Sequence, residues 1–531
     1  MISRHLEEGS SKSTSQGWSH LFPHVLDGVR RAMAEHEAIV FLQCGRLVNR
    51  HWCQWATQAT KVLAVTIDEY FDEEKLPKLR EYFPGRDFRR RTEGLVNCFS
   101  ALESLTLTDM KAADLQPLQR LPRLRHLKLI DDVECQWGQW GVAEFRLMHV
   151  AAMTGLVSLE FLLCDITDQG VGQLVSLVCL EKLGLQRCYR ITDASLSTIA
   201  LLPALTDVNL KDCSHISDVG IVRLAKLTGL AKLMLGNTDG FEDRFSNEGA
   251  RVLGTMTNLV ALDVGCSYHM SDSGVEHLKS LTKLTHLSLP ANTSDTTLRS
   301  LRSLTGISHL RFHGGEEVTN RGLSWLTQLC KLSRLELAPS NEGLKLIAEV
   351  TRLVSLNLSV WTRIDRDITI DGIQRLTTLT NLTTLRFSLE WMTDKGVMVF
   401  SALTGLKNLN LNGCERITMV GLRWISRLTR LTDLSLCACG EVAKSFDGQF
   451  LGNLQCLTKL ALAHNDELTE EGLRTLTRLT NLAALDLRYC TNITRRGLWH
   501  LAPLRFLTCV EFEGCPALRS LARPYFLCKW V

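Results

Sequence analysis

The stretch Leu205–Leu227, LTDVNLKDCSHISDVGIVRLAKL, decides the fold of this chain. If its first residue is position 1, apolar side chains stand at positions 1, 4, 6 and 9. Side chains of a strand alternate between two faces, so Val208 and Leu210 face one side and the polar residues between them face the other. In the second half the apolar spacing changes to three, after Ser217 or Asp218, either of which can cap a helix. One such unit cannot bury its apolar side alone and must stack on copies of itself.

Seventeen copies of the L-x-x-L-x-L frame follow one another along the chain. Their mean period is about 25 residues, inside the roughly 20–29-residue window of leucine-rich repeats. We therefore expect an α/β leucine-rich-repeat solenoid with a parallel inner sheet and short outer helices, preceded by a small helical segment. The frames begin at residues 102, 124, 156, 180, 205, 230, 259, 284, 307, 332, 353, 382, 406, 431, 457, 482 and 507. The expected divisions are a disordered stretch (1–17), a helical segment (18–60), an imperfect first repeat with a linker (61–101), and the repeat domain with a closing cap (102–531).

Charge and hydropathy exclude several classes of function. The 60 basic and 57 acidic residues leave a net charge of +3, so no overall charge favours nucleic acid or an anionic membrane. No apolar run reaches the roughly 18 residues of a membrane span, and the N-terminus lacks the apolar core of a signal peptide. We therefore predict an intracellular protein, cytoplasmic or nuclear, without nucleic-acid or membrane partners.

The chain has 18 cysteines, and seven of them occupy position 9 of a repeat. Asn292 and Asn465 fill the same position in other repeats. A residue that recurs in one repeating position is better interpreted as a small buried group than as half of a disulfide. We expect reduced, buried thiols at these seven positions: Cys164, Cys188, Cys213, Cys414, Cys439, Cys490 and Cys515.

Residues 18–60 carry apolar side chains at helical spacing and resemble an F-box. That motif opens with a Leu-Pro step and closes on Val-Cys-x-x-Trp; here Val48 and Trp52 keep the closing interval, with Asn49 at the usual cysteine. The acidic residue that usually follows the proline is absent. The resemblance implies that a Skp adaptor of a cullin ubiquitin ligase binds Leu21, Pro23, Leu26, Leu42, Leu47, Val48 and Trp52.

The repeats themselves resemble the cysteine-containing leucine-rich repeats of F-box proteins. Ile191-Thr192-Asp193 and Met392-Thr393-Asp394 match the I-T-D segment of that class. The resemblance implies a substrate-recognition subunit of a Skp–cullin–F-box ubiquitin ligase, which acts by proximity. The alternative is a leucine-rich-repeat scaffold or regulatory binding protein unconnected to ubiquitin, in which residues 18–60 only shield the first repeat.

No catalytic motif is present: the sequence has no phosphate-binding loop, no H-E-x-x-H, no C-x-x-C and no G-x-S-x-G. We therefore predict neither an enzyme nor a cofactor. Positions 3, 5 and 7 of each repeat should face the concave side, and basic residues and histidines gather there on three consecutive repeats. We expect this patch to bind an acidic or phosphorylated segment of a target, more tightly as the histidines gain protons towards about pH 6. Its residues are His286, His309, Arg311, His313 and Arg334, and their spacing predicts no metal site.

Overall fold

The structure is a computed structural model of the whole chain. It describes residues 61–66, 101–108, 115–130, 144–236, 245–265, 267–313, 317–359, 368–444 and 446–518. The chain forms two compact units, residues 1–159 and residues 160–531. Each unit is described by itself.

The first unit holds short parallel strands. The strand expected near residue 62 is present as β1, which pairs in parallel with β2, and β2 pairs in parallel with β3. Strand β4 (Ser158–Leu162) spans the boundary between the units. The other described elements here are β1 (Val62–Thr66), β2 (Ser104–Thr108), the 3-10 helix η2 (Gln116–Arg120), β3 (His126–Ile130) and α7 (Glu144–Ala151).

The second unit is built on one parallel sheet, in which each strand from β5 to β18 pairs with the next. All these strands begin at position 3 of a repeat frame, so the frame read from the sequence is the register of the sheet. The strands are β5 (Lys182–Gln186), β6 (Asp207–Asn209), β7 (Lys232–Met234), β8 (Ala261–Asp263), β9 (His286–Leu289), β10 (His309–Phe312), β11 (Arg334–Glu336), β12 (Ser355–Asn357), β13 (Thr384–Arg386), β14 (Asn408–Asn410), β15 (Asp433–Ser435), β16 (Lys459–Ala461), β17 (Ala484–Asp486) and β18 (Cys509–Glu511).

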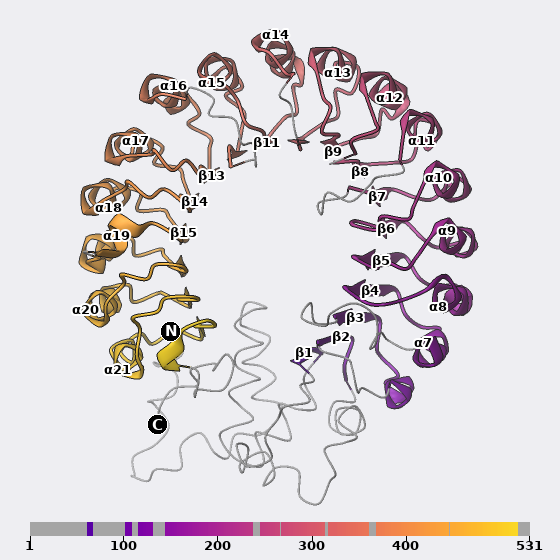
Figure 1. The fold of residues 1–531 in the computed structure, drawn as a ribbon, viewed down its shortest axis with the longest axis horizontal. Helices are drawn as coiled ribbons and strands as arrows, with labels where there is room; N and C mark the ends of the chain where they lie inside the picture. The colour runs from indigo at the N-terminus through magenta and orange to yellow at the C-terminus, as the bar shows by residue number, and fades with distance from the viewer. Residues whose placement is uncertain are drawn as a thin grey trace, which may run out of the picture. The chain divides into compact units, whose positions relative to one another are not determined.

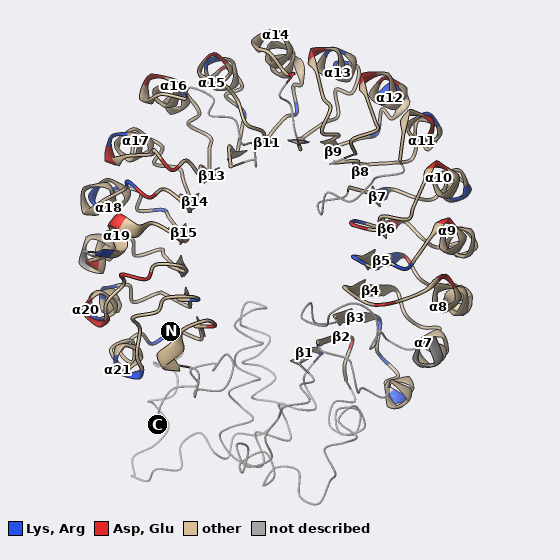
Figure 2. Cartoon of the chain, in the orientation of Figure 1, with Lys and Arg blue, Asp and Glu red and all other residues tan. Residues whose placement is uncertain are grey.

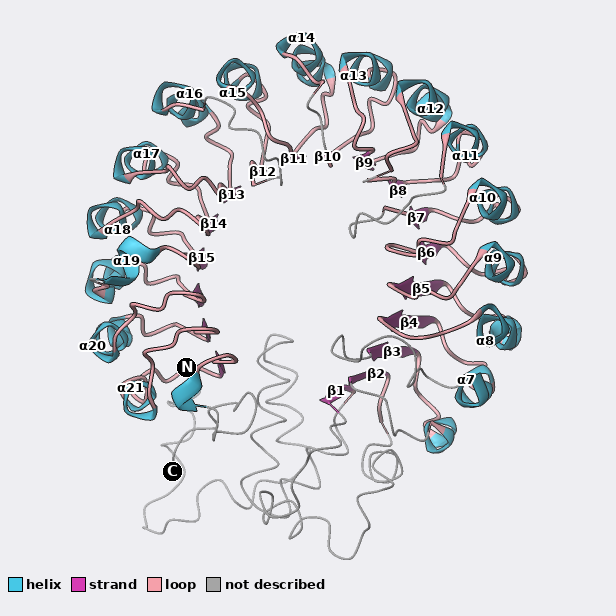
Figure 3. Cartoon of the chain, in the orientation of Figure 1, coloured by secondary structure: helices cyan, strands magenta, loops and turns pink. Residues whose placement is uncertain are grey.

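Within this unit the strands line the concave side and the helices form the convex side (Figure 1, Figure 3). The helices are α8 (Asp168–Gln173), α9 (Asp193–Ile199), α10 (Asp218–Leu224), α11 (Asn247–Leu253), α12 (Asp272–His277), α13 (Asp295–Leu301), α14 (Asn320–Leu323), α15 (Asn341–Ala348), α16 (Ile370–Arg375), α17 (Asp394–Phe400), α18 (Met419–Ile425), α19 (Gly440–Lys444), α20 (Glu470–Thr475) and α21 (Arg495–Trp499). Short 3-10 helices add η3 (Leu174–Ser176), η4 (Leu278–Ser280), η5 (Ser324–Gln328), η6 (Leu376–Thr378), η7 (Gly448–Asn453), η8 (Leu476–Arg478) and η9 (Pro516–Leu518). The expected α/β solenoid is confirmed.

The core lies between the sheet and the helices. Val208 and Leu210, at positions 4 and 6, are at most 1% exposed, as are Ile221 and Leu224 of α10. Burying one such aliphatic side chain stabilises the fold by about 1.5–3 kcal/mol. Because each repeat contributes the same set, the core runs without interruption along the array.

The helix starts join neighbouring repeats through side chains. Ser217 is the N-cap of α10 and accepts a hydrogen bond from the backbone N–H of Val219. Asp218, the other candidate, instead reaches the next repeat, where its carboxylate accepts from the N–H and the hydroxyl of Ser246 at 2.9 and 2.6 Å. Asp193 and Ser217 make the same pair one repeat earlier, at 2.8 and 2.5 Å. The I-T-D segment therefore caps one helix and ties it to its neighbour.

The seven cysteines at position 9 are buried as expected, and so is Asn465, whereas Asn292 is exposed and donates to the carbonyl of Tyr268 at 2.5 Å. All seven cysteines are buried thiols. The thiols of Cys213, Cys439, Cys490 and others donate to the backbone carbonyl at position 6 of the preceding repeat, and the Asn465 amide donates to the equivalent carbonyl. A buried cysteine and a buried asparagine can therefore make the same hydrogen bond at this position, as Asn465 shows.

Position 8, which the sequence pattern did not single out, adopts left-handed backbone in several repeats. His464 and Tyr489 have φ of 57°, and Gly413 and Gly514 have φ of 72° and 75°. A non-glycine residue in this region costs about 1–2 kcal/mol. The conformation turns the N–H towards the next repeat, so that His464 donates to the carbonyl of Arg488 at 2.8 Å and Tyr489 to that of Glu513 at 2.7 Å. These bonds extend the sheet ladder beyond the strand ends and offset the cost.

Several expectations concern residues outside the described ranges. They are the disordered start (1–17), the F-box-like segment (18–60), most of the linker (67–100) and the end of the closing cap (519–531). These remain predictions.

Candidate functional site on the concave sheet

The concave face, defined as positions 3, 5 and 7 on β5 to β18, carries the side chains that the core does not use. Neighbouring strands lie about 4.8 Å apart, so equal positions form straight rows across the sheet. Lys459, Arg386 and Arg488 are exposed there, whereas the leucines between them are buried. Charged residues of this unit lie on the strands as well as on the helices (Figure 2). The face is a rigid, polar surface suited to contact with another macromolecule.

The predicted histidine and arginine patch lies on β9, β10 and β11. The sheet register places His286, His309 and Arg334 side by side in the position-3 row. The two imidazoles stack, with ring centroids 3.9 Å apart and planes 18° apart. Together with Arg334 they form a flat aromatic and cationic surface.

The surroundings of His286 and His309 oppose the pH dependence expected for this patch. Partial burial, together with each histidine's cationic neighbours, lowers the pKa of His286 and lowers that of His309 from 6.5 to about 4. A proton on one stacked ring would lie against the other ring and near Arg334, which disfavours the charged form. The His309 ring is therefore neutral at pH 6, and the lowered pKa of His286 reduces the charge that this ring adds to the patch on acidification.

The remaining two residues of the patch have partners of their own. The sheet register aligns Arg311 with Ser288 and Glu336, and the guanidinium of Arg311 lies 3.4 Å from the Glu336 carboxylate. The His313 side chain is only 8% exposed and turns towards the neighbouring repeats. The patch therefore presents fewer positive charges than the sequence indicates.

His313 belongs to a buried charged cluster on the same face. Asp263 is 4% exposed, and its carboxylate forms an ion pair with Lys211, accepts from the N–H of Gly265 at 2.9 Å, and lies 4.0 Å from Nε2 of His313. Burial opposes ionisation of Asp263, but Lys211 and the Gly265 N–H hold its pKa below the usual value. Gly265 is required because a Cβ there would lie 2.0 Å from the His313 ring. The cluster ties β6, β8 and β10 together.

A metal site is not formed by these histidines. Among the described residues, no group of three histidine, cysteine, aspartate or glutamate side chains is placed to hold a metal ion. His286 and His309 are adjacent, whereas His313 turns away towards Asp263.

A second surface, which the sequence reasoning missed, lies over β13 to β18. It is a hollow of about 650 Å³, here called the C-terminal hollow. Small side chains leave this space: Ser435, Ala461 and Ala484 stand where neighbouring repeats carry larger residues. Its polar lining includes Arg386, Asn408, Asn410, Asp433, Lys459, Asp486, Arg488 and Glu511. The available signal was the run of small residues at concave positions beside charged ones.

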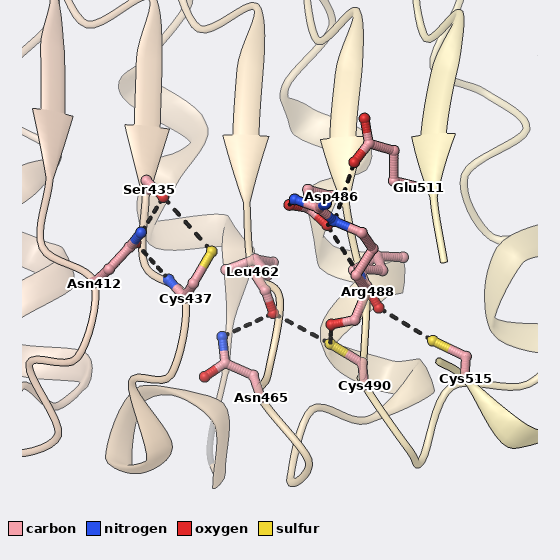
Figure 4. A network of polar contacts seen from close by, with 11 residues as sticks. Asn412, Ser435, Cys437, Leu462, Asn465, Asp486, Arg488, Cys490, Glu511 and Cys515 are labelled. Carbon is pink, nitrogen blue, oxygen red and sulfur yellow. Dashed lines mark hydrogen bonds and ion pairs between the residues drawn. The ribbon is translucent and has the colours of Figure 1, made fainter. Parts of the chain in front are cut away.

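A polar network borders this hollow (Figure 4). The Arg488 guanidinium donates to both oxygens of Asp486 at 3.0 and 2.8 Å and lies 3.1 Å from Glu511, and these carboxylates raise its pKa. Asn412 accepts from the Ser435 hydroxyl at 2.6 Å and from the Cys437 N–H at 2.9 Å. These contacts fix the side chains in place before any partner binds.

Comparisons with known proteins agree with the repeat frame. A family model described as a Leucine Rich repeat matches residues 453–476. In each of the seventeen frames a strand begins at position 3. Together with the family match, this pattern defines the fold as a leucine-rich-repeat solenoid. A search of curated proteins finds no match. No family model of an F-box is among the matches.

Three solved structures are similar in part. An internalin from Listeria monocytogenes is 19% identical, over 69% of this chain and 88% of that one, with a TM-score of 0.34. TLR13 in complex with ssRNA13 is 18% identical, over 79% and 59%, with a TM-score of 0.35. Mouse RP105, in complex with MD-1, is 18% identical, over 80% and 77%, with a TM-score of 0.38.

The adaptor-binding residues predicted between Leu21 and Trp52 lie outside the described residues. Within the described part of the chain, no helix has both the length and the apolar character needed to cross a membrane.

Proposed function

We propose that this protein binds a partner protein on the concave face of residues 160–531 and presents it to a Skp–cullin–F-box ubiquitin ligase. The observation that carries the first part is the row arrangement of exposed polar side chains on a sheet whose register is continuous from β5 to β18. Rigid rows need little reorganisation on binding, and their charges select the partner. The second part rests on the resemblance of residues 18–60 to an F-box.

The patch on β9 to β11 is one contact surface for an acidic or phosphorylated segment of the target. Arg334 is exposed and supplies charge-assisted hydrogen bonds, and the stacked imidazoles beside it supply a flat surface. Arg311 contributes once a target carboxylate competes with Glu336 for its guanidinium. Binding at this patch should weaken with salt but change little between pH 7 and pH 6.

The adaptor proposal is tested with the full chain and a purified Skp adaptor in a binding titration. Replacing Trp52 with Ala, with folding checked by circular dichroism, should abolish binding, because a large aromatic anchor dominates such interfaces. The matched control carries Arg311→Ala with Arg334→Ala and should bind the adaptor like the wild type. If the wild type has no affinity for any Skp adaptor, the protein is a scaffold or regulatory binding protein and residues 18–60 act as a cap.

The target patch is tested with a target recovered by the wild type. The double change Arg311→Ala with Arg334→Ala should weaken binding at low and moderate salt, whereas Glu336→Gln should strengthen it by releasing Arg311. Equal binding by all three proteins would exclude the patch and leave the rest of the concave face to be searched.

A further inference from the structure

The C-terminal hollow is crossed by one continuous row of position-5 side chains. The register joins Arg386, Asn410, Ser435, Ala461, Asp486 and Glu511 on consecutive strands from β13 to β18. This row changes from a cation at one end, through small neutral side chains, to carboxylates at the other. The order of charges along it is the basis of the inference.

Arg386 forms the cationic end. It is exposed, and the register places an amide on either side of it, Asn357 on β12 and Asn410 on β14. The described residues provide no carboxylate to pair with its guanidinium. A partner's acidic side chain can therefore reach it without displacing an internal ion pair.

The opposite end is acidic. Asp486 and Glu511 are neighbours in the row, and Arg488 bridges them. With exposed Glu513 beside them, these four side chains carry a net charge of −2. Because the side chain of Glu511 is 45% exposed, it has room for a second cation.

The side chains in the middle of the row are short and carry no charge. Ser435 and Ala461 form this part of the row, and in the neighbouring position-3 row Ala484 lies beside Lys459, whose amine is 3.7 Å from Asp433. The Asn410 oxygen accepts from the N–H of Asn412 at 3.0 Å, which leaves the amide NH₂ to donate to a partner's backbone carbonyl. A main chain with small side chains fits over such a floor.

We propose that the C-terminal hollow binds an extended peptide segment of a partner protein, with an acidic side chain over Arg386 and a basic side chain over Asp486 and Glu511. Five steps between strands of about 4.8 Å separate the two ends by about 24 Å, which an extended chain of about seven residues spans. The carboxylate end repels phosphates, so a nucleic acid does not fit this row. The inference rests on the proposal that the concave face binds protein and names a segment it takes; it does not depend on the adaptor.

The test uses the full chain and labelled synthetic peptides in fluorescence anisotropy titrations. The probe carries one glutamate and one lysine seven residues apart, with serine and alanine between them and blocked termini. Three comparison peptides carry two glutamates, two lysines, or the original pair only three residues apart. We expect the probe to bind at least tenfold more tightly than each comparison peptide, and more weakly as salt rises.

Arg386→Glu should reverse this order, so that the peptide with two lysines binds more tightly than the probe. The matched control is Lys232→Glu, an exposed cation of the concave face on β7 that belongs neither to the hollow nor to the patch, and it should leave the order unchanged. Far-UV circular dichroism and urea unfolding establish that both variants fold.

Absence of saturable binding by the probe, or the same order of affinities in Arg386→Glu as in the wild type, would overturn the inference. A partner protein that binds the wild type and Arg386→Glu equally would also overturn it, while the proposal that the concave face binds protein would stand. Loss of that partner in the Arg386→Glu variant, and not in Lys232→Glu, supports both.

Discussion

Asn465 offers a sharp test of how neighbouring repeats are joined. Its side chain is 2% exposed and makes three hydrogen bonds with backbone groups. The amide NH₂ donates to the carbonyls of Leu436 and Leu462, both at 2.9 Å, and the oxygen accepts from the N–H of Cys439 at 2.8 Å. The carbonyl of Leu462 also accepts from the Cys490 thiol at 3.2 Å and so keeps a partner when the amide is removed (Figure 4).

Asn465→Ala therefore removes these bonds from two buried groups, the Leu436 carbonyl and the Cys439 N–H. Each such group costs about 1–3 kcal/mol, so we expect the free energy of unfolding to fall by about 3 kcal/mol. Asn465→Cys should cost about half as much, because a thiol restores the bond to the Leu436 carbonyl that cysteines make in other repeats. The measurement is urea unfolding followed by far-UV circular dichroism and tryptophan fluorescence.

The matched control is Asn381→Ala, which removes an exposed amide that donates to the Thr351 carbonyl at 3.0 Å. It should change the free energy of unfolding by no more than about 0.5 kcal/mol. A loss below about 1 kcal/mol for Asn465→Ala, or a cysteine variant less stable than the alanine variant, would refute the role given to position 9.

Three further outcomes are expected. The seven thiols at position 9 should resist alkylation in the native protein and react fully, without a reductant, after denaturation, since burial raises the pKa of Cys213 and Cys490 to about 12; mass spectrometry that finds them paired as disulfides would contradict this. The pKa of His309 is about 4 in the folded protein against an ordinary 6.5, so the unfolded state binds more protons between these pH values and stability should fall as pH falls from 6.5 to 4. His309→Gln should therefore make the unfolding midpoint less dependent on pH in that window. The same pH dependence in wild type and variant would show that His309 does not cause it. Lys211→Met leaves Asp263 buried without its cation and should lower the free energy of unfolding by about 3–5 kcal/mol at pH 7. The double variant Lys211→Met with Asp263→Asn should recover part of this loss. Equal unfolding midpoints for the wild type and the single variant would show that the ion pair contributes nothing to stability.

The sequence predicted the sheet closely because equal positions of successive repeats pair with one another, so the spacing of the repeats gives the strand register. Leu205, Val208 and Leu210 recur at fixed spacing, and a strand begins at position 3 of each frame from β2 to β18. The burial of the position-9 cysteines followed from the same repetition. Residues such as Asp218 were read only as local caps, because the hydrogen bond to Ser246 joins residues 28 positions apart.

The candidate site was predicted less well, for a reason that lies in side-chain direction. The frame places His286, His309, Arg311, His313 and Arg334 on one face, and they are on it. It does not say that two of these rings stack or that Arg311 turns to Glu336. The C-terminal hollow was missed because it is a space left by small side chains on several neighbouring strands, and those strands are far apart in the sequence.

By itself, the sequence determined the solenoid, the strand register, the residues of the core and the burial of the cysteines at position 9, because each of these properties is repeated and local. Only the tertiary structure decided which concave charges face a partner and which pair within the protein. Those choices depend on side chains about 5 Å apart on neighbouring strands but about 25 residues apart in the chain, and the charge that each presents depends on its burial and its neighbours.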